Sequence, residues 1–318
     1  MCGICGIVGK GVKQDDLKMM RSLLWTTSLR GEHSTGVYSY HPYRPKREKH
    51  KLRKELGPSP LFILRDDGRK VQESSLGTVT SDVIFGHCRY ATKGKITVEN
   101  AHPFDTGRYV GMHNGTLTDK KYRHETKTDS EMMFLDMEER GIVPVLNDLD
   151  YMSAYSIAMF DKRTEEVIFA TNGDRPLNFA VNNKRRTMYF ASELSALKFA
   201  AGRHREDVTF YSFEKNKVYS ANVSDVTHLN DHAFWDIEDL EPKDKKFDWS
   251  IMDWEQGPST SIQGPTVRSC CVCGTVLEGD SLKNANAYVF HESVYLTCPT
   301  CIGDVDQAEE EYSAAVNQ

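Results

Sequence analysis

A cysteine stands directly behind Met1 and opens a short run of glycine and β-branched residues, positions 2–8. Aminopeptidases that remove Met1 accept only small second residues, so we expect the mature chain to begin at Cys2. The Cys2 thiol is a nucleophile as the thiolate, and a free α-amine, with a usual pKa of about 7.7–8, can take its proton near neutral pH. One residue would then supply both nucleophile and base. The alternative is a small buried side chain in a first strand.

A second group of polar residues ends two apolar runs, which predict buried strands at residues 83–90 and 109–112. An unpaired guanidinium away from water is costly, so Arg89 at the end of the first run suits an anionic ligand. The second run leads into His113, Asn114 and Gly115. Asn-Gly is typical of a tight turn, but the Asn114 amide and the Gly115 N–H together also suit an oxyanion.

The elements that position these residues are mostly strands. Paired runs such as 155–160 and 166–170 flank charged turns, and helices are fewer, so the fold class is α+β with hairpin-paired sheets. Residues 128–131 have capping-box character and should begin a helix, where a carboxylate such as that of Asp129 is ordinarily a cap.

Composition limits the classes of protein. The chain has 318 residues, 39% hydrophobic and 27% charged, with a formal net charge of -6, which is typical of a soluble globular protein and argues against a dominant nucleic-acid surface. No apolar run approaches the roughly 18 residues of a membrane span, and no leader is evident, so we expect no membrane association and a cytoplasmic location. Seven Lys or Arg in residues 44–54 could grip phosphates or form a solvated hairpin edge.

The C-terminal region carries a second pattern. Residues 241–266 are predicted to be a linker, residues 267–303 a zinc-binding module and residues 304–318 an acidic tail. Two C-x-x-C pairs match a four-thiolate structural zinc site. The predicted ligands are Cys270, Cys273, Cys298 and Cys301. Two alternatives stay open: Cys271 in place of Cys270, and His291 in place of one thiolate.

Taken in order, the motifs of residues 2 to about 200 resemble the class II glutamine amidotransferase domain, an N-terminal-nucleophile hydrolase. The motifs are Cys2-Gly3-Ile4, Arg30-Gly31-x-x-Ser34-x-Gly36, Gly86-His87-x-Arg89-Tyr90-x-Thr92, Asn100-Ala101-His102-Pro103, His113-Asn114-Gly115, Thr128-Asp129-Ser130-Glu131, Asp174-Arg175-Pro176-Leu177 and Ala191-Ser192-Glu193. The Arg89-Tyr90 pair looks more like the amidophosphoribosyltransferase branch than the hexosamine branch. The resemblance implies a four-layer αββα sandwich over residues 1–240.

The resemblance also implies the role of each residue. The Cys2 thiolate attacks the glutamine amide, Asn114 and Gly115 hold the oxyanion, and a γ-glutamyl thioester releases ammonia and then glutamate. Arg89 binds the substrate α-carboxylate as a fork, and Asp129 takes the α-ammonium. Further substrate contacts are implied for Tyr90 and Thr92, and a supporting loop for Arg30 and Gly31. No cofactor is implied for catalysis.

Two positions depart from the family pattern. His33 stands where the family usually has an acidic residue, which puts the charge network of this loop in doubt. Lys93 replaces a position that is often small or His, at the rim of the glutamine pocket.

We find no phosphoribosyl-pyrophosphate motif, no pyrophosphatase loop and no room for sugar-isomerase domains after residue 240. We therefore expect an ammonia-supplying glutaminase whose acceptor synthase is another chain, with the zinc module docking that partner or a nucleic acid. The alternatives are a stand-alone γ-glutamyl amidohydrolase and a catalytically silent glutamine-binding or scaffold protein.

Overall fold

The computed structural model describes residues 2–67, 76, 80–92, 94–226, 235–242, 286–290 and 293–297. The chain divides into two compact units, Met1–Lys245 and Lys246–Gln318. Most of the predicted linker, all four predicted zinc ligands, the alternatives Cys271 and His291, and the acidic tail lie outside the described residues.

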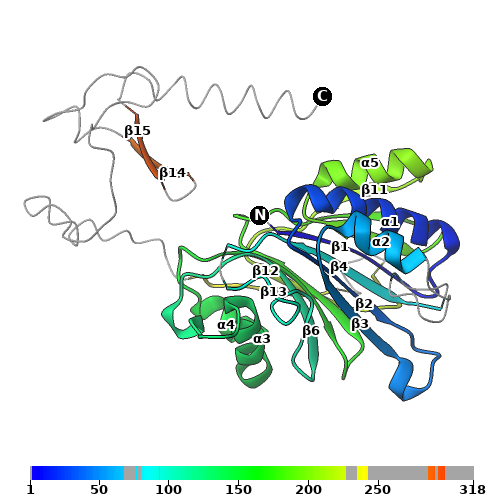
Figure 1. Ribbon diagram of the computed structural model, residues 1–318, viewed down its shortest axis with the longest axis horizontal. Helices are drawn as coiled ribbons and strands as arrows, with labels where there is room; N and C mark the ends of the chain where they lie inside the picture. Colours follow the sequence, from blue (N-terminus) through cyan, green and yellow to red (C-terminus); the bar gives the residue numbers. More distant parts are fainter. Residues whose placement is uncertain are drawn as a thin grey trace, which may run out of the picture. The chain divides into compact units, whose positions relative to one another are not determined.

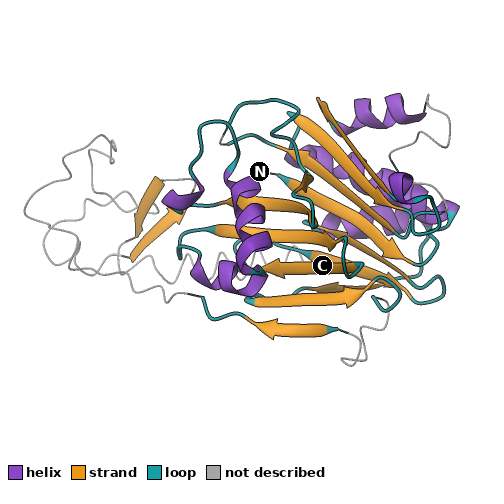
Figure 2. Ribbon diagram, turned by 90° about the horizontal axis from the view of Figure 1, so that it is seen from below, coloured by secondary structure: helices purple, strands orange, loops and turns teal. Residues whose placement is uncertain are grey.

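The first unit is built on a seven-stranded and a six-stranded antiparallel sheet, which Figures 1 and 2 show stacked face to face. The seven-stranded sheet has the order β11-β9-β10-β1-β4-β2-β3. Its strands are β1 (Gly3–Gly9), β2 (Ser34–Tyr40), β3 (His50–Leu56), β4 (Val83–Arg89), β9 (Asn178–Asn182), β10 (Thr187–Ala191) and β11 (Thr209–Ser212).

The six-stranded sheet has the order β13-β12-β8-β7-β6-β5. Its strands are β5 (Phe104–Asp105), β6 (Tyr109–Thr116), β7 (Ala154–Asp161), β8 (Glu166–Thr171), β12 (Lys217–Asn222) and β13 (Asp236–Asp239). Alternate side chains of both sheets meet between them in a core rich in aromatic rings, because strand side chains point to opposite faces in turn.

Helices cover both outer faces. The helices α1 (Gln14–Thr27), α2 (Ser59–Asp67) and α5 (Leu194–His204) pack on the seven-stranded sheet, and α3 (Asp129–Arg140) and α4 (Ile142–Asp148) pack on the six-stranded one. Short 3-10 helices lie at η1 (Ser28–Arg30), η2 (Lys46–Glu48) and η4 (Lys120–Tyr122). The predicted α+β class and the four-layer αββα sandwich are confirmed.

Two local predictions had alternatives that the fold distinguishes. Asn114-Gly115 is not a turn, because β6 continues to Thr116 and pairs with β7 through both residues. The basic run of residues 44–54 lies on η2 and on the edge strand β3, as expected for a hairpin edge. Two of its cations are already engaged: Arg53 with Asp66 at 2.9 Å, and Lys54 with the Ala101 carbonyl at 2.7 Å.

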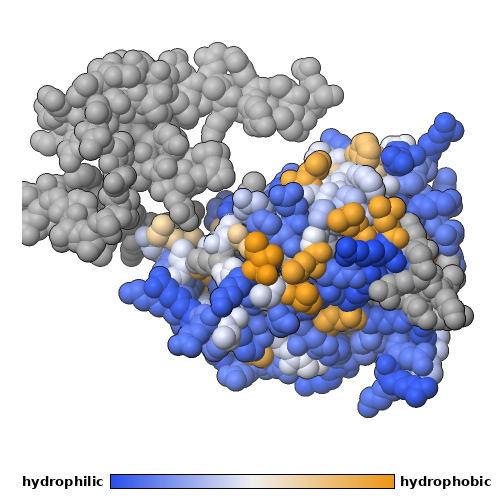
Figure 3. Space-filling view, viewed as in Figure 1, coloured by the Kyte–Doolittle hydropathy of each residue, from blue (hydrophilic) through white to orange (hydrophobic). Residues whose placement is uncertain are grey.

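Most of the face in Figure 3 is hydrophilic, with scattered apolar patches. Leu29, at 91% exposure, and Leu64, at 63%, are among the exposed apolar side chains of the first unit.

In the second unit, β14 (Asn286–Phe290) and β15 (Ser293–Thr297) form an antiparallel hairpin. This hairpin lies between the two C-x-x-C pairs in the sequence.

Candidate active site

Cys2 lies immediately before β1, which is a central strand of the seven-stranded sheet. The Cys2 side chain is half-buried, and its thiol donates a weak hydrogen bond of 3.5 Å to the carbonyl oxygen of Tyr90. Burial raises the pKa of the thiol, while the positive charges of Arg89 and Arg30 act in the opposite direction. The resting thiol is therefore protonated at neutral pH, and a base must take its proton before it can attack.

The loop of Arg30 and Gly31 holds the Cys2 backbone. Arg30 Nε donates to the Cys2 carbonyl at 2.8 Å, and its Nη1 pairs with the Glu193 carboxylate. A Cβ on Gly31 would overlap the Arg89 backbone, so only glycine lets this loop approach the end of β4. Sequence reasoning assigned no role to Glu193, although the residue belongs to one of the quoted motifs.

Arg89 ends β4 and is 3% exposed. Its Nη1 donates to the Lys95 carbonyl at 3.1 Å, which fixes the guanidinium against the following loop. Burial lowers the pKa of Arg89, whereas a Cys2 thiolate and the Asp129 carboxylate act to raise it. An arginine remains charged despite such a shift, so the site holds a buried cation close enough to Cys2 and Asp129 to interact with both electrostatically.

His33 takes a defined place in this loop. Its ring Nδ1 accepts a 2.9 Å hydrogen bond from the backbone N–H of Ala91, and its own backbone N–H donates to the Arg89 carbonyl at 3.0 Å. Its ring stacks on that of Tyr90, with the centroids 4.7 Å apart. An imidazole nitrogen thus provides the acceptor that a carboxylate could provide at this position. Tyr90 remains 44% exposed.

Asn114 and Gly115 lie near the end of β6, in the facing sheet. Asn114 is 1% exposed, and neither atom of its side-chain amide has a hydrogen-bond partner among the described residues. A buried unpaired amide is costly unless a ligand satisfies it. Gly115 has φ +156°, and a Cβ there would overlap the Ala154 carbonyl oxygen, so the backbone requires glycine at this point.

Asp129 is the first residue of α3, and Thr128 is the N-cap that accepts the Glu131 N–H at 3.2 Å. The Asp129 carboxylate accepts the N–H of Leu117 at 3.1 Å through one oxygen and that of Ser130 at 2.9 Å through the other. The carboxylate therefore holds the chain just after β6, and Asp129 remains partly exposed to solvent. Thr92 is exposed in the loop after β4, and Lys93 lies outside the described residues.

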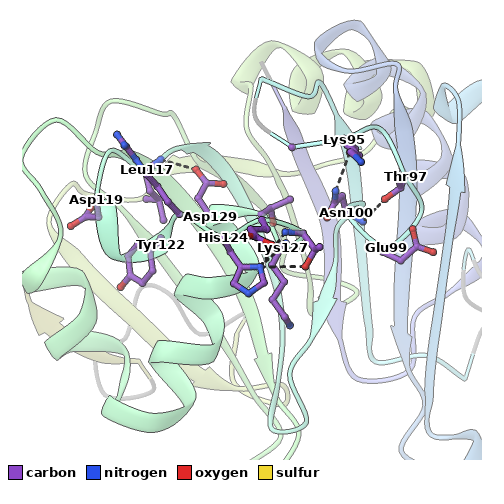
Figure 4. A pocket seen from close by; sticks show the side chains of 15 residues that line it. Lys95, Thr97, Glu99, Asn100, Leu117, Asp119, Tyr122, His124, Lys127 and Asp129 are labelled. Atoms are coloured by element: carbon purple, nitrogen blue, oxygen red, sulfur yellow. Dashed lines mark hydrogen bonds between the residues drawn. The ribbon is translucent and has the colours of Figure 1, made fainter.

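A cavity of about 470 Å³ borders Asp129. Figure 4 shows its two sides: Lys95, Thr97, Glu99 and Asn100 come from the loop after β4, and Leu117 and Asp129 belong to the opposite side. Asp129 thus faces the cavity, while Cys2 and Arg89 are not among its described lining residues. The cavity therefore reaches Asp129, the residue expected to bind the substrate α-ammonium.

Within the described part of the chain, no group of three His, Cys, Asp or Glu side chains could hold a metal ion. None of the described helices is long and apolar enough to cross a membrane.

Comparisons with known proteins point to one family. Residues 106–199 match a family model described as "Glutamine amidotransferase domain". Curated relatives include the glutamine–fructose-6-phosphate aminotransferases of Staphylococcus epidermidis, 29% identical over 64% of this chain and 31% of that protein, and of Sulfolobus acidocaldarius, 26% identical over 80% of this chain and 42% of that protein. The chain thus spans less than half the length of these relatives.

A solved structure agrees in fold. Glutamine phosphoribosylpyrophosphate amidotransferase from B. subtilis superposes with a TM-score of 0.53 at 21% identity, over 75% of this chain and 49% of that one. The sequence relatives and the structural neighbour come from the two branches named above, so the predicted closer kinship to the amidophosphoribosyltransferase branch stays a prediction.

Proposed function

We propose that the chain, which is similar to glutamine amidotransferases in sequence and in fold, is a class II, N-terminal-nucleophile member of that group and hydrolyses glutamine through a γ-glutamyl thioester on Cys2. The observation that carries the proposal is the unpaired, buried amide of Asn114, in a site that also contains a buried arginine and a half-buried cysteine. An oxyanion would satisfy the amide that the folded chain leaves without a partner.

In the proposed reaction, the α-amine of mature Cys2 takes the thiol proton and Sγ attacks the side-chain carbonyl of glutamine. Asn114 Nδ2 and the Gly115 N–H stabilise the oxyanion; one such donor typically lowers the barrier by about 3 kcal/mol. The amine returns the proton to the leaving nitrogen, the C–N bond breaks, and ammonia departs. Water then cleaves the thioester to give glutamate and the free thiol.

Two side chains of opposite charge would orient the substrate. Arg89 would bind the α-carboxylate as a fork, and Asp129 would bind the α-ammonium from the cavity side. Tyr90 and Thr92 would line the rim, and Arg30 and Gly31 would hold the nucleophile in place. This division explains why a charged guanidinium is retained at a nearly buried position.

The ammonia is proposed to pass to an acceptor synthase in another chain. The support is that the curated relatives are glutamine–fructose-6-phosphate aminotransferases, whose name pairs glutamine with an acceptor substrate. We further propose that the second unit binds one structural zinc ion through Cys270, Cys273, Cys298 and Cys301. The support is the C-x-x-C spacing together with the β14–β15 hairpin, which lies between the two pairs. The zinc module would dock the synthase or a nucleic acid.

The test is glutamate release from glutamine by the full chain, together with its intact mass. We expect a chain without Met1, with activity that Cys2→Ala abolishes and Cys5→Ala retains, because Cys5 is a buried core residue. Retention of Met1, or equal activity in Cys2→Ala, would contradict the mechanism. Faster release from another γ-glutamyl amide would identify a stand-alone amidohydrolase, and stimulation by an added synthase would identify an ammonia supplier.

A further inference from the structure

Two buried histidines, His87 and His102, have no part in the chemistry proposed above, although His87 lies only two residues before Arg89 on β4. His87 lies on β4 and is 0% exposed, and His102 lies in the loop before β5 and is 3% exposed. Their rings stack with centroids 4.2 Å apart. Buried imidazoles are usually bonded through both nitrogens, whereas His87 Nδ1 and both nitrogens of His102 lack partners among the described residues.

The one bond that His87 makes crosses the sandwich. Its Nε2 lies 3.1 Å from the carbonyl oxygen of His113. A carbonyl oxygen only accepts, so Nε2 carries the proton and donates. Because β4 belongs to the seven-stranded sheet and β6 to the six-stranded sheet, this hydrogen bond ties the two sheets together.

This hydrogen bond joins β4, which pairs with the strand that follows the nucleophile, to β6, which carries the proposed oxyanion donors. In the register of the seven-stranded sheet, His87 pairs with Ile4, two residues beyond the nucleophile Cys2. On the other sheet, the accepting carbonyl belongs to His113, which directly precedes the proposed oxyanion donor Asn114. The strands β1 and β6 also contact each other across the interface.

Asn114 depends on this backbone support, since its own amide forms no hydrogen bond that would fix it. Its position is set from one side by pairing with Ser156 of β7 and from the other by the His87 bond to the preceding carbonyl. The His113 ring is itself held by Ser130, whose Oγ lies 2.8 Å from Nδ1.

We propose that His87 is a positioning residue, which fixes the spacing between the nucleophile on one sheet and the oxyanion donors on the other, and that the stacked His102 holds its ring plane. The inference rests on the proposed glutaminase function. Burial lowers the pKa of His87 to about 3 and that of His102 well below its usual range, so both rings stay neutral near neutral pH. The hydrogen bond to the His113 carbonyl keeps the single proton of the neutral ring on Nε2, because Nδ1 has no partner among the described residues.

Three variants test the role in the full chain. His87→Leu removes the donor, His87→Gln keeps an N–H donor at a similar reach, and Phe85→Leu truncates a buried side chain two residues earlier on the same face of β4. We expect His87→Leu to lower kcat about 10- to 100-fold, because a displacement near 1 Å can cost that much. Its KM should stay within about threefold, because Arg89 and Asp129 remain. His87→Gln should recover most of the kcat.

The control separates positioning from stability. Phe85→Leu should lower the melting temperature and leave kcat per folded molecule unchanged. Equal kcat in His87→Leu and the wild type, or equal losses in His87→Leu and Phe85→Leu, would overturn the proposal.

A second readout needs neither a variant nor activity. Nitrogen-15 NMR of the wild-type histidines should show His87 as the neutral tautomer protonated on Nε2, with a slowly exchanging proton, from pH 5 to pH 8. A His87 protonated on Nδ1, or titrating in that range, would overturn the assignment of the cross-sheet bond. Absence of glutamate release by the wild type would instead refute the proposed function, and the NMR result would still decide whether the bond exists.

Discussion

Arg89 and Asp129 each hold a hydrogen bond within the fold besides the substrate contact proposed for them. Arg89 fixes the Lys95 carbonyl, and Asp129 fixes the Leu117 N–H next to the oxyanion donors. Substitution of either residue should therefore change the shape of the site as well as its charge. A substitution that keeps the charge separates the loss of shape from the loss of charge.

Arg89→Lys keeps the charge and removes the planar fork, so it tests recognition of the α-carboxylate. We expect KM for glutamine to rise at least about tenfold with a smaller change in kcat, because a lysine cannot bind a carboxylate through two parallel N–H groups. Arg123→Lys, at an exposed arginine that lines the cavity beside Asp129, makes the same exchange outside the proposed carboxylate site and should behave like the wild type. Steady-state kinetics of both variants would decide, and an unchanged KM in Arg89→Lys would remove Arg89 from substrate binding.

The buried imidazoles predict an acid limit to stability. Burial lowers the folded-state pKa of His87, His102 and His113, while the unfolded chain has the usual value near 6.5. The unfolded state therefore binds more protons, and stability is lost as the pH falls below about 6.5 toward the folded pKa. For His87 alone, with a folded pKa of about 3, the loss at pH 5 should be about 2 kcal/mol.

Denaturant unfolding at pH 7 and pH 5 would measure this loss of stability. In His87→Gln the loss should be smaller by about 2 kcal/mol, the contribution expected for His87. A wild-type stability that does not change between these pH values would contradict the neutral buried state.

At the scale of elements, β6 carries the proposed oxyanion donors because it continues through Asn114-Gly115 instead of turning there. Pairing with β7 through Ser156 and Tyr155 holds this end of the strand straight. The close approach of Gly115 to the Ala154 carbonyl leaves no space for a side chain. The same geometry that presents the Gly115 N–H thus excludes every other residue type.

Gly115→Ala tests this packing. We expect kcat to fall at least about 100-fold, the typical cost of losing one oxyanion donor, together with a loss of stability, because the Cβ must displace β7. Gly11→Ala is the matched control: Gly11 also has a positive φ, +70°, but nothing lies within 4 Å of its added Cβ. The control should cost about 1 kcal/mol through backbone strain and leave kcat unchanged. Comparable activity in the two variants would show that the close approach is unimportant.

At the scale of the whole molecule, the two units are predicted to have separate tasks. The first contains every residue proposed for glutamine hydrolysis, and the second contains the predicted zinc ligands. Any bound zinc should depend on the C-terminal cysteines, because their C-x-x-C spacing is that of a structural zinc site.

We expect about one zinc ion per chain, lost in Cys298→Ser and retained in Cys5→Ala, with basal glutaminase activity preserved in both. Elemental analysis of the purified proteins would give the metal content. A folded, metal-free wild-type chain would refute the zinc assignment. Loss of basal activity together with the metal would show that the two units are not independent.

The sequence alone determined the motif order, the position of Cys2, the α+β class and the resemblance that named Arg89, Asn114, Gly115 and Asp129. These are local properties: residue type, spacing and the alternation of apolar side chains along a strand. Even so, Asn-Gly was ambiguous, because the same dipeptide suits a turn and the end of a strand.

Only the tertiary structure decided between such alternatives, since the answer depends on residues distant in the sequence. Pairing with β7, about 40 positions away, makes Asn114-Gly115 part of a strand. The bond from His87 to the His113 carbonyl joins two sheets whose relative placement no local pattern encodes. Likewise, the buried amide of Asn114 could be recognised as unpaired only once all its neighbours were in place, because burial and hydrogen bonding are properties of the packed molecule.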